Sequence, residues 1–242
     1  MRHFFYTLLF ALIVYAGKAQ DDVDEYDAAI ERRRVHTDFK ESLFAVRFSA
    51  TLPAPVSNAV LRTKFRGIYE MNFSFNMRLA TNFFAGFGFK DGLLGVDGNV
   101  PNPKTNLTLN TKMQMYTGYL KVGFNKYHSE NVFSTFACNI GYNSSFFTNV
   151  VNVNSPIIDK TFASVLVEPE YSLNFAVEDN FSIGLFVSYN YMPTAFNPTN
   201  IAFQDVTSIT GLKTSGATGI INFGFGFYYG MGKKFQRRDK NR

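Results

Sequence analysis

Residues 67–80 read GIYEMNFSFNMRLA, and this stretch decides the fold. Every second position is apolar: Tyr69, Met71, Phe73, Phe75, Met77 and Leu79. The positions between them are polar: Glu70, Asn72, Ser74, Asn76 and Arg78. A period of two residues indicates a β-strand with one apolar and one polar face. The run exceeds the roughly four to eight residues of a half-buried soluble strand. It fits the roughly 9–11 residues with which a tilted strand crosses a bilayer.

The same alternation recurs along the chain. Seven further segments show it: about 43–52, 83–90, 114–125, 132–146, 162–177, 181–192 and 219–231. The connections alternate in length: short near 80–82, 127–131 and 178–180, and long near 53–66, 91–111, 148–161 and 193–216. An even strand number with short periplasmic turns and longer extracellular loops is typical of outer-membrane barrels. We therefore predict an all-β fold, a transmembrane antiparallel up-and-down β-barrel of about eight strands.

Composition agrees with dispersed rather than clustered apolar residues. Aromatic residues make up 17% of the 242 residues, with 28 Phe, 13 Tyr and no Trp. Hydrophobic residues reach 46%, yet the mean hydropathy is only −0.07. After residue 20 we find no run of about 18 apolar residues, the length expected of a transmembrane helix. A multi-span helical protein is therefore excluded.

The first 19 residues have the layout of a secretory signal peptide. Arg2 and His3 precede an apolar stretch over 4–15, and Gly17 and Ala19 supply the small residues of a cleavage site. A membrane anchor is the alternative, but twelve apolar residues are few for a span. We expect four parts: a signal peptide (1–19), a charged periplasmic segment (20–41), the barrel (42–232) and a basic periplasmic tail (233–242).

A family resemblance follows from these features. The layout resembles the small eight-stranded outer-membrane barrels of the OmpA and OmpX type. The signal ending in Ala19-Gln20 and the Tyr/Phe/Asn-rich strands resemble the PorT-like barrels of Bacteroidota. The last strand, GIINFGFGFYY over 219–229, resembles a C-terminal insertion signal, although here residues 232–242 follow instead of a terminal aromatic. The resemblance covers about residues 42–232, is architectural and implies a place in the bacterial outer membrane.

The polar parity of the strands should face the barrel interior. It contains seven charged residues: Arg47, Glu70, Arg78, Lys90, Lys121, Glu168 and Glu170. An eight-stranded barrel holds its own side chains or one small ligand, so we expect these charges to form an ion network. Two alternatives stay open: a catalytic carboxylate pair of the glycosidase kind, and a gated proton or ion path.

Nothing in the sequence points to an enzyme. The mature histidines, His36 and His128, do not lie in predicted outer loops, and no metal spacing, nucleophile elbow or phosphate loop is found. Cys138 is the only cysteine, so no internal disulfide forms. We expect no catalytic residues, cofactor or metal. Cleavage after Ala19 removes Arg2 and Lys18, leaving 22 basic and 19 acidic residues, which indicates no nucleic-acid partner.

Two regions could bind partners other than outer-membrane lipid. The last long loop carries apolar residues that suggest a contact surface, or else a loop folded into the barrel mouth: Phe196, Ile201, Phe203 and Ile209. The tail carries basic residues that could meet phosphates or a periplasmic protein: Lys233, Lys234, Arg237 and Arg238.

Two functions from different classes follow. The first is a non-catalytic structural or accessory subunit of an outer-membrane protein complex, for which the resemblance to PorT-like barrels implies type 9 protein secretion or gliding. The alternative is a narrow outer-membrane channel or a transporter of small hydrophobic ligands.

Overall fold

The computed structural model describes residues 42–80, 82–96, 100–101, 108–109, 111–129, 131–152, 155–178, 180–196 and 216–231. Eight long strands dominate: β1 (Phe44–Pro55), β2 (Phe65–Arg78), β3 (Phe83–Val96), β6 (Lys112–Tyr127), β7 (Val132–Asn152), β8 (Ser155–Glu178), β9 (Phe181–Ala195) and β10 (Ala217–Met231). A short helix, α3 (Ala59–Lys64), joins β1 to β2. Two-residue strands β4 (Val100–Pro101) and β5 (Thr108–Leu109) pair separately.

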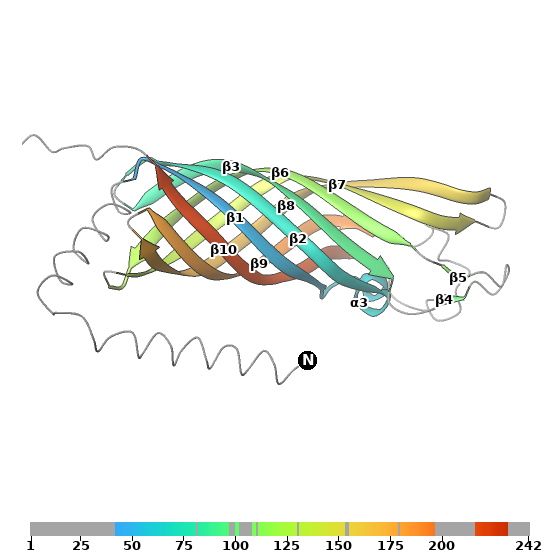
Figure 1. Cartoon of the computed structure of the whole chain (residues 1–242). Helices are drawn as coiled ribbons and strands as arrows, with labels where there is room; N and C mark the ends of the chain where they lie inside the picture. Colours follow the sequence, from blue (N-terminus) through green and yellow to red (C-terminus); the bar gives the residue numbers. More distant parts are fainter. Residues whose placement is uncertain are drawn as a thin grey trace, which may run out of the picture.

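The eight long strands close into one antiparallel barrel (Figure 1). Each pairs with its neighbours in the chain, and β1 pairs with β10 from Phe44↔Met231 to Pro55↔Ile220, which closes the sheet. Closure removes the free sheet edges that a bilayer would leave without hydrogen bonds. The predicted eight-stranded fold is confirmed, with every predicted strand present and most of them longer than predicted.

One predicted loop is wrong. Residues 148–161 were expected to form an extracellular loop, but β7 extends to Asn152 and β8 begins at Ser155, and the two form a hairpin that projects beyond the rest of the barrel (Figure 1). The pairs Val150↔Ile158 and Asn152↔Ser155 hold this extension together. β-branched residues favour extended pairing. The two strands of the ribbon pair the backbone groups that face each other, and water beyond the barrel can satisfy the groups on the outer edges.

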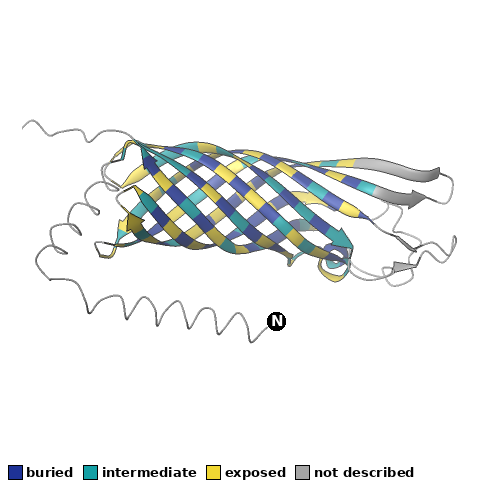
Figure 2. Cartoon of the chain, in the orientation of Figure 1, coloured by how far each residue is buried: buried dark blue, intermediate teal, exposed yellow. Residues whose placement is uncertain are grey.

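The barrel is apolar outside and polar inside, the reverse of a soluble protein. Figure 2 shows buried and exposed residues alternating along the strands. Outward side chains include Phe73, Phe87 and Leu120, which are 50%, 59% and 69% exposed. Inward ones include Arg47, which is 0% exposed. An apolar outer wall of this extent would be a liability in water and is what a lipid environment requires.

The two ends of the barrel differ. One end, called here the turn end, carries the tight connections between β2 and β3, β6 and β7, and β8 and β9. The other, the loop end, carries α3 and the β4–β5 pair, and the hairpin of β7 and β8 extends past it (Figure 1). Ser42 and Met231 both lie at the turn end, as an even strand number requires. No helix among the described residues is long and apolar enough to span a membrane.

Aromatic pairs across neighbouring strands reinforce the outer wall. The rings of Phe83, Phe124, Phe136 and Tyr171 follow one another across β3, β6, β7 and β8, with centroid separations of 6.1, 5.0 and 4.8 Å. Cross-strand aromatic pairs of this kind stabilise a particular register. A slip of one residue in the pairing of two strands would turn these rings into the lumen. The outward rings and the inward polar residues therefore favour the same strand register.

Candidate functional site

Six charged side chains meet in the middle of the lumen, and we call them the ion network. They come from β1, β2, β3, β6 and β8: Arg47, Glu70, Lys90, Lys121, Glu168 and Glu170. None is more than 4% exposed. Three are cations and three are carboxylates, so the network is neutral as a whole. In a low-dielectric interior, such balance is the condition under which buried charges are tolerated.

Glu170 is the anchor of one half of the network. The Arg47 guanidinium donates a hydrogen bond to Glu170 Oε1. Lys121 Nζ lies 2.9 Å from Glu170 Oε1 and 3.0 Å from Oε2. Two cations therefore share one carboxylate, and their joint positive charge requires a further anion nearby.

Glu168 supplies that anion and links the two halves. It faces the same way as Glu170 because residues two apart on a strand share a face. Glu168 accepts hydrogen bonds from Lys90 and from Asn139 Nδ2, the latter at 2.7 Å. Lys90 Nζ also lies 3.2 Å from Glu70 Oε1, and Asn190 Nδ2 donates to Glu70 Oε2 at 3.1 Å. Amides thus complete the hydrogen bonding of the carboxylates.

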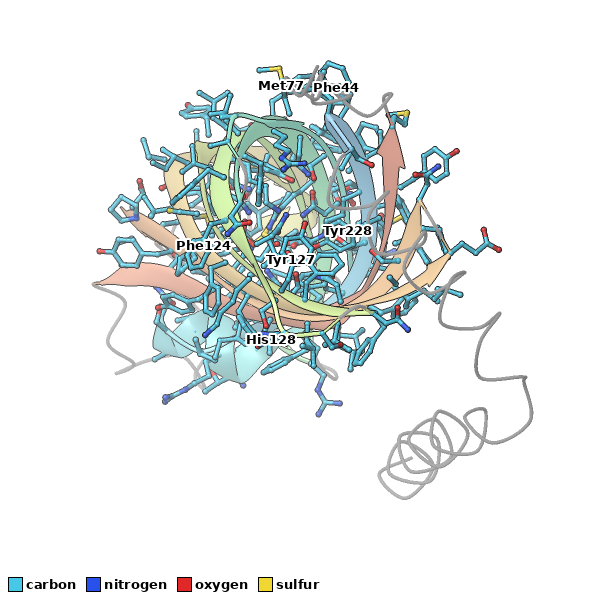
Figure 3. The ribbon with its side chains drawn as sticks, turned by 90° about the vertical axis from the view of Figure 1, so that its left-hand side faces the viewer. Phe44, Met77, Phe124, Tyr127, His128 and Tyr228 are labelled. Carbon is cyan, nitrogen blue, oxygen red and sulfur yellow. The ribbon has the colours of Figure 1, made fainter. Side chains whose placement is uncertain are left out.

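Aromatic side chains fill the space around the network. The Arg47 guanidinium carbon lies 4.4 Å from the ring centroid of Phe186 and 5.0 Å from that of Tyr228. Viewed from the turn end, the rings of Tyr127 and Tyr228 lie within the barrel outline, while Phe44 and Met77 lie on its outer edge (Figure 3). Contacts between the guanidinium and these rings offset part of the cost of removing the charge from water.

The Tyr119 ring of β6 lies over the inner face of β3 and reaches β2, because two glycines make room for it. Its hydroxyl donates to Asn72 Oδ1. A Cβ built at Gly88 would overlap the Tyr119 ring, and one at Gly141 would lie 2.6 Å from Tyr119 Cβ. Inward glycines could have lined a passage through the barrel. At Gly88 and Gly141, however, the Tyr119 side chain covers the space.

An apolar cluster, which we call the mouth cluster, closes the loop end. Its buried members come from α3, the loop ends of the strands and the chain after β9: Val60, Leu61, Phe65, Leu94, Met113, Met115, Phe147, Leu166, Met192, Phe196 and Ile220. Val60 and Leu61 of α3 are both 0% exposed. The helix therefore lies over the mouth with its apolar side against the cluster.

Asn58 sets the helix in that position. Its φ of 61° lies in the left-handed region that asparagine tolerates better than most residues. Asn58 Oδ1 accepts from the backbone N–H of Val60 and Leu61, and its Nδ2 donates to the Phe196 carbonyl at 3.0 Å. One side chain thus caps α3 and ties it to the loop that follows β9.

At the turn end, the described residues leave a small pocket of about 60 Å³. Asn76, Arg78, Asn125 and Tyr228 are among its lining residues. Ligand sites usually measure roughly 300–1,000 Å³. Between this pocket and the mouth cluster stand the ion network and its aromatic surround, so side chains occupy the lumen along its length.

Two predicted site residues lie elsewhere than expected. Arg78 was placed in the ion network, but it lies at the turn-end limit of β2, half-buried, and its Nε donates to the Ala80 carbonyl at 3.2 Å. Phe196 was placed on a contact surface, but it is 1% exposed and its ring packs 5.4 Å from that of Phe147. Both corrections have the same cause. Arg78 is the last residue of β2 and Phe196 directly follows β9, so their positions at strand ends place them at the two ends of the barrel.

The other predicted features lie outside the described residues. They are the signal peptide, the segment 20–41, the loop residues Ile201, Phe203 and Ile209, and the tail residues Lys233, Lys234, Arg237 and Arg238. The mouth cluster was not predicted. A signal for it was present in the sequence. The inward-facing positions of a strand are polar near its middle but apolar near the loop end, as on β6, where Met113 and Met115 precede Thr117 and Tyr119.

His128, Ser134 and Tyr171 lie within hydrogen-bond distance of one another in succession, an arrangement that resembles part of a catalytic site. His128 Nε2 lies 2.7 Å from Ser134 Oγ, which lies 3.0 Å from the Tyr171 hydroxyl. Ser134 is 1% exposed, however, which keeps substrate from its oxygen. Glu168 and Glu170 are engaged by cations and amides. Within the described ranges, no group of three or more His, Cys, Asp or Glu residues could hold a metal ion.

No protein-family model and no curated protein sequence matches the chain. Solved structures do. Neisserial surface protein A is 13% identical, with 78% of this chain and 98% of that one covered and a TM-score of 0.51. The outer membrane protein OprG from Pseudomonas aeruginosa is 10% identical (78% and 96% covered, TM-score 0.47), and the outer membrane protease OmpT from Escherichia coli is 9% identical (79% and 97%, 0.39).

The likeness to Neisserial surface protein A shows a shared fold at an identity too low to carry a function. The chain is a closed β-barrel of outer-membrane type. A shared fold does not imply a shared function, so an activity has to be argued from this chain's own residues.

Proposed function

We propose that this protein is a non-catalytic outer-membrane barrel that acts as a structural or accessory subunit of an outer-membrane protein complex. The observation that carries this proposal is the filled lumen. The mouth cluster fills the loop end, and the ion network fills the middle together with the rings of Phe186, Tyr119 and Tyr228 around it. When its own side chains fill the interior of a barrel, other molecules can bind only to its outer wall, its loops and its two ends.

The charge balance of the lumen supports the same proposal. A conducting path needs sites that bind an ion weakly enough to release it. Here each carboxylate of the network is engaged by a cation of the same chain, Glu170 by two of them. Moving an ion through would require breaking pairs whose loss costs several kcal/mol.

The location and process are narrower parts of the proposal. The signal peptide with cleavage near Ala19 and the PorT-like sequence features support export to the bacterial outer membrane of a Bacteroidota species. In that setting the turn end faces the periplasm, and the partners are outer-membrane lipid and proteins of the outer membrane or periplasm. The resemblance supports type 9 protein secretion or gliding as the process served.

Recovery of native complexes tests the subunit role. Cells expressing the tagged full chain are solubilised in gentle detergent, and the co-purified proteins are identified and quantified by mass spectrometry. We expect a constant ratio of one or more exported proteins to the barrel, reduced when residues 233–242 are deleted if the tail is a contact. A barrel tagged and exported in the same way, but unrelated in sequence, is the control. Recovery of the barrel alone would contradict the proposal.

A further inference from the structure

The outer wall is recessed over Pro169 in β8. A groove of about 480 Å³ lies there, and its lining comes from β7, β8, β9 and β10. The outward side chains that line it are Phe136, Pro169, Tyr171, Val187, Tyr189, Ile221 and Phe223. The volume falls within the roughly 300–1,000 Å³ of ligand sites. By contrast, outward positions elsewhere carry protruding side chains such as Phe87 and Leu120.

The backbone explains the recess. Val167 pairs with Tyr191 and Glu170 with Ser188, but within the described part of β8 and β9 the two residues between, Glu168 and Pro169, have no pairing partner on β9. Proline lacks the N–H that a ladder hydrogen bond needs and is otherwise confined to strand edges and bulges. On the other side Pro169 still pairs with Cys138 of β7. The pairing is therefore interrupted on the β9 side, while the register of β8 against β9 is the same before and after Pro169.

We propose that this groove is a binding site for an acyl chain of a membrane phospholipid. The groove lies among outward apolar side chains that are exposed to the surroundings of the barrel: Phe136 is 41% exposed, Tyr171 38% and Phe223 57%. Within a bilayer the molecules that reach such a wall are acyl chains. Apolar contact alone gives no preference there, because lipid tails are as apolar as the wall, so closer van der Waals packing has to provide it. An acyl chain in a recess makes van der Waals contacts on several sides, whereas an acyl chain on a flat wall makes them on one side only.

The proposal depends on the proposed function only in placing the barrel in a bilayer. The full chain is reconstituted into phosphatidylcholine vesicles that contain a phosphatidylcholine with a photoreactive group at mid-chain. After irradiation, labelled residues are mapped by mass spectrometry. We expect labelling of Tyr189, Ile221 and Phe223 to exceed labelling of outward residues on the opposite wall by about tenfold, which corresponds to ~1.4 kcal/mol. Phe73 on β2 and Phe87 on β3 are such residues.

Two variants fill the groove from different strands, Pro169→Leu from β8 and Ile221→Phe from β10. Each is expected to lower labelling of the groove to the level of the opposite wall. Val167→Leu, two residues along the same face of β8, is the matched control and should leave labelling unchanged. Using both filling variants keeps the test informative if one fails to fold.

The possible failures are distinct. Even labelling around the wild-type wall, or groove labelling that persists in both filled variants, would overturn the acyl-chain site while leaving the barrel in the membrane. Absence of labelling anywhere on a folded barrel would instead contradict its place in a bilayer.

Discussion

Glu170 accepts hydrogen bonds from both Arg47 and Lys121, and it is buried. Replacing it with glutamine leaves the network with one uncompensated cation. We expect Glu170→Gln to lower the free energy of unfolding by about 3–5 kcal/mol. The measurement is urea unfolding of the barrel in lipid vesicles, followed by the change in gel mobility on unfolding.

The control for this variant is Glu178→Gln, an exposed carboxylate at the end of β8, for which we expect a change within about 0.5 kcal/mol. The double variant Glu170→Gln/Lys121→Met removes one charge of each sign and should recover part of the lost stability. Equal effects of Glu170→Gln and Glu178→Gln would show that the network does not hold the lumen together.

Two neighbouring glycines provide a matched pair. A Cβ at Gly88 would lie 2.6 Å from the Phe73 carbonyl oxygen and would overlap the Tyr119 ring, whereas one at Gly118 meets nothing within 4 Å. We expect Gly88→Ala to destabilise the barrel by about 1–3 kcal/mol through overpacking. Gly118→Ala should be neutral or slightly stabilising. The same unfolding measurement checks both, and equal stability of the two variants would mean that the lumen has room to spare.

The sequence predicted which charged residues face inward, because period two assigns each residue to a face. It did not predict which pairs form. Arg47 and Glu170 are 123 residues apart, and their meeting depends on the order and stagger of the strands around the barrel. For Arg78 the face alone was insufficient, since its height on β2 puts it beyond the reach of the network.

Among the elements, α3 was not indicated by the sequence, and neither were the two-residue strands β4 and β5. The helix has six residues, too few for stability on its own. Packing of Val60 and Leu61 in the mouth cluster and the cap from Asn58 hold it in place. A helix stabilised by a cluster whose other residues come largely from seven strands leaves little local signal in its own residues.

The dependence of α3 on Asn58 is testable by proteolysis. Arg62 is exposed and Lys64 half-buried, and both are trypsin sites in α3. Asn58→Ala removes the cap and the bond to the Phe196 carbonyl, a loss of about 1–2 kcal/mol. We expect cleavage after Arg62 and Lys64 to become roughly 5–30 times faster. Asn82→Ala, in a turn at the opposite end, is the control and should not alter cleavage in α3. An unchanged rate in Asn58→Ala would show that Asn58 does not hold the helix.

The strands were predictable because each carries its own pattern over ten or more residues, and a membrane barrel demands that pattern on every strand. The hairpin extension of β7 and β8 was not, because Asn, Ser and Pro around 152–156 are equally typical of a loop. In this extension the pairing of β7 with β8 determines the extended structure, and an alternation of polar and apolar residues within either strand does not.

At the scale of the whole molecule, the lumen has three successive layers: the mouth cluster at the loop end, the ion network in the middle, and aromatic and polar side chains at the turn end. Each layer draws residues from several strands, so the filling of the lumen depends on closure of the barrel. These layers favour a non-conducting barrel over the alternative of a narrow channel.

The most direct test of a filled lumen is electrical. The purified full chain is inserted into planar bilayers, and current is recorded beside the Glu168→Gln variant. A filled lumen predicts no steady conductance from the wild-type barrel, since an ion would have to displace the Lys90–Glu168 pair and the mouth cluster. A steady open pore whose conductance changes in Glu168→Gln would contradict the account and establish a channel through the ion network.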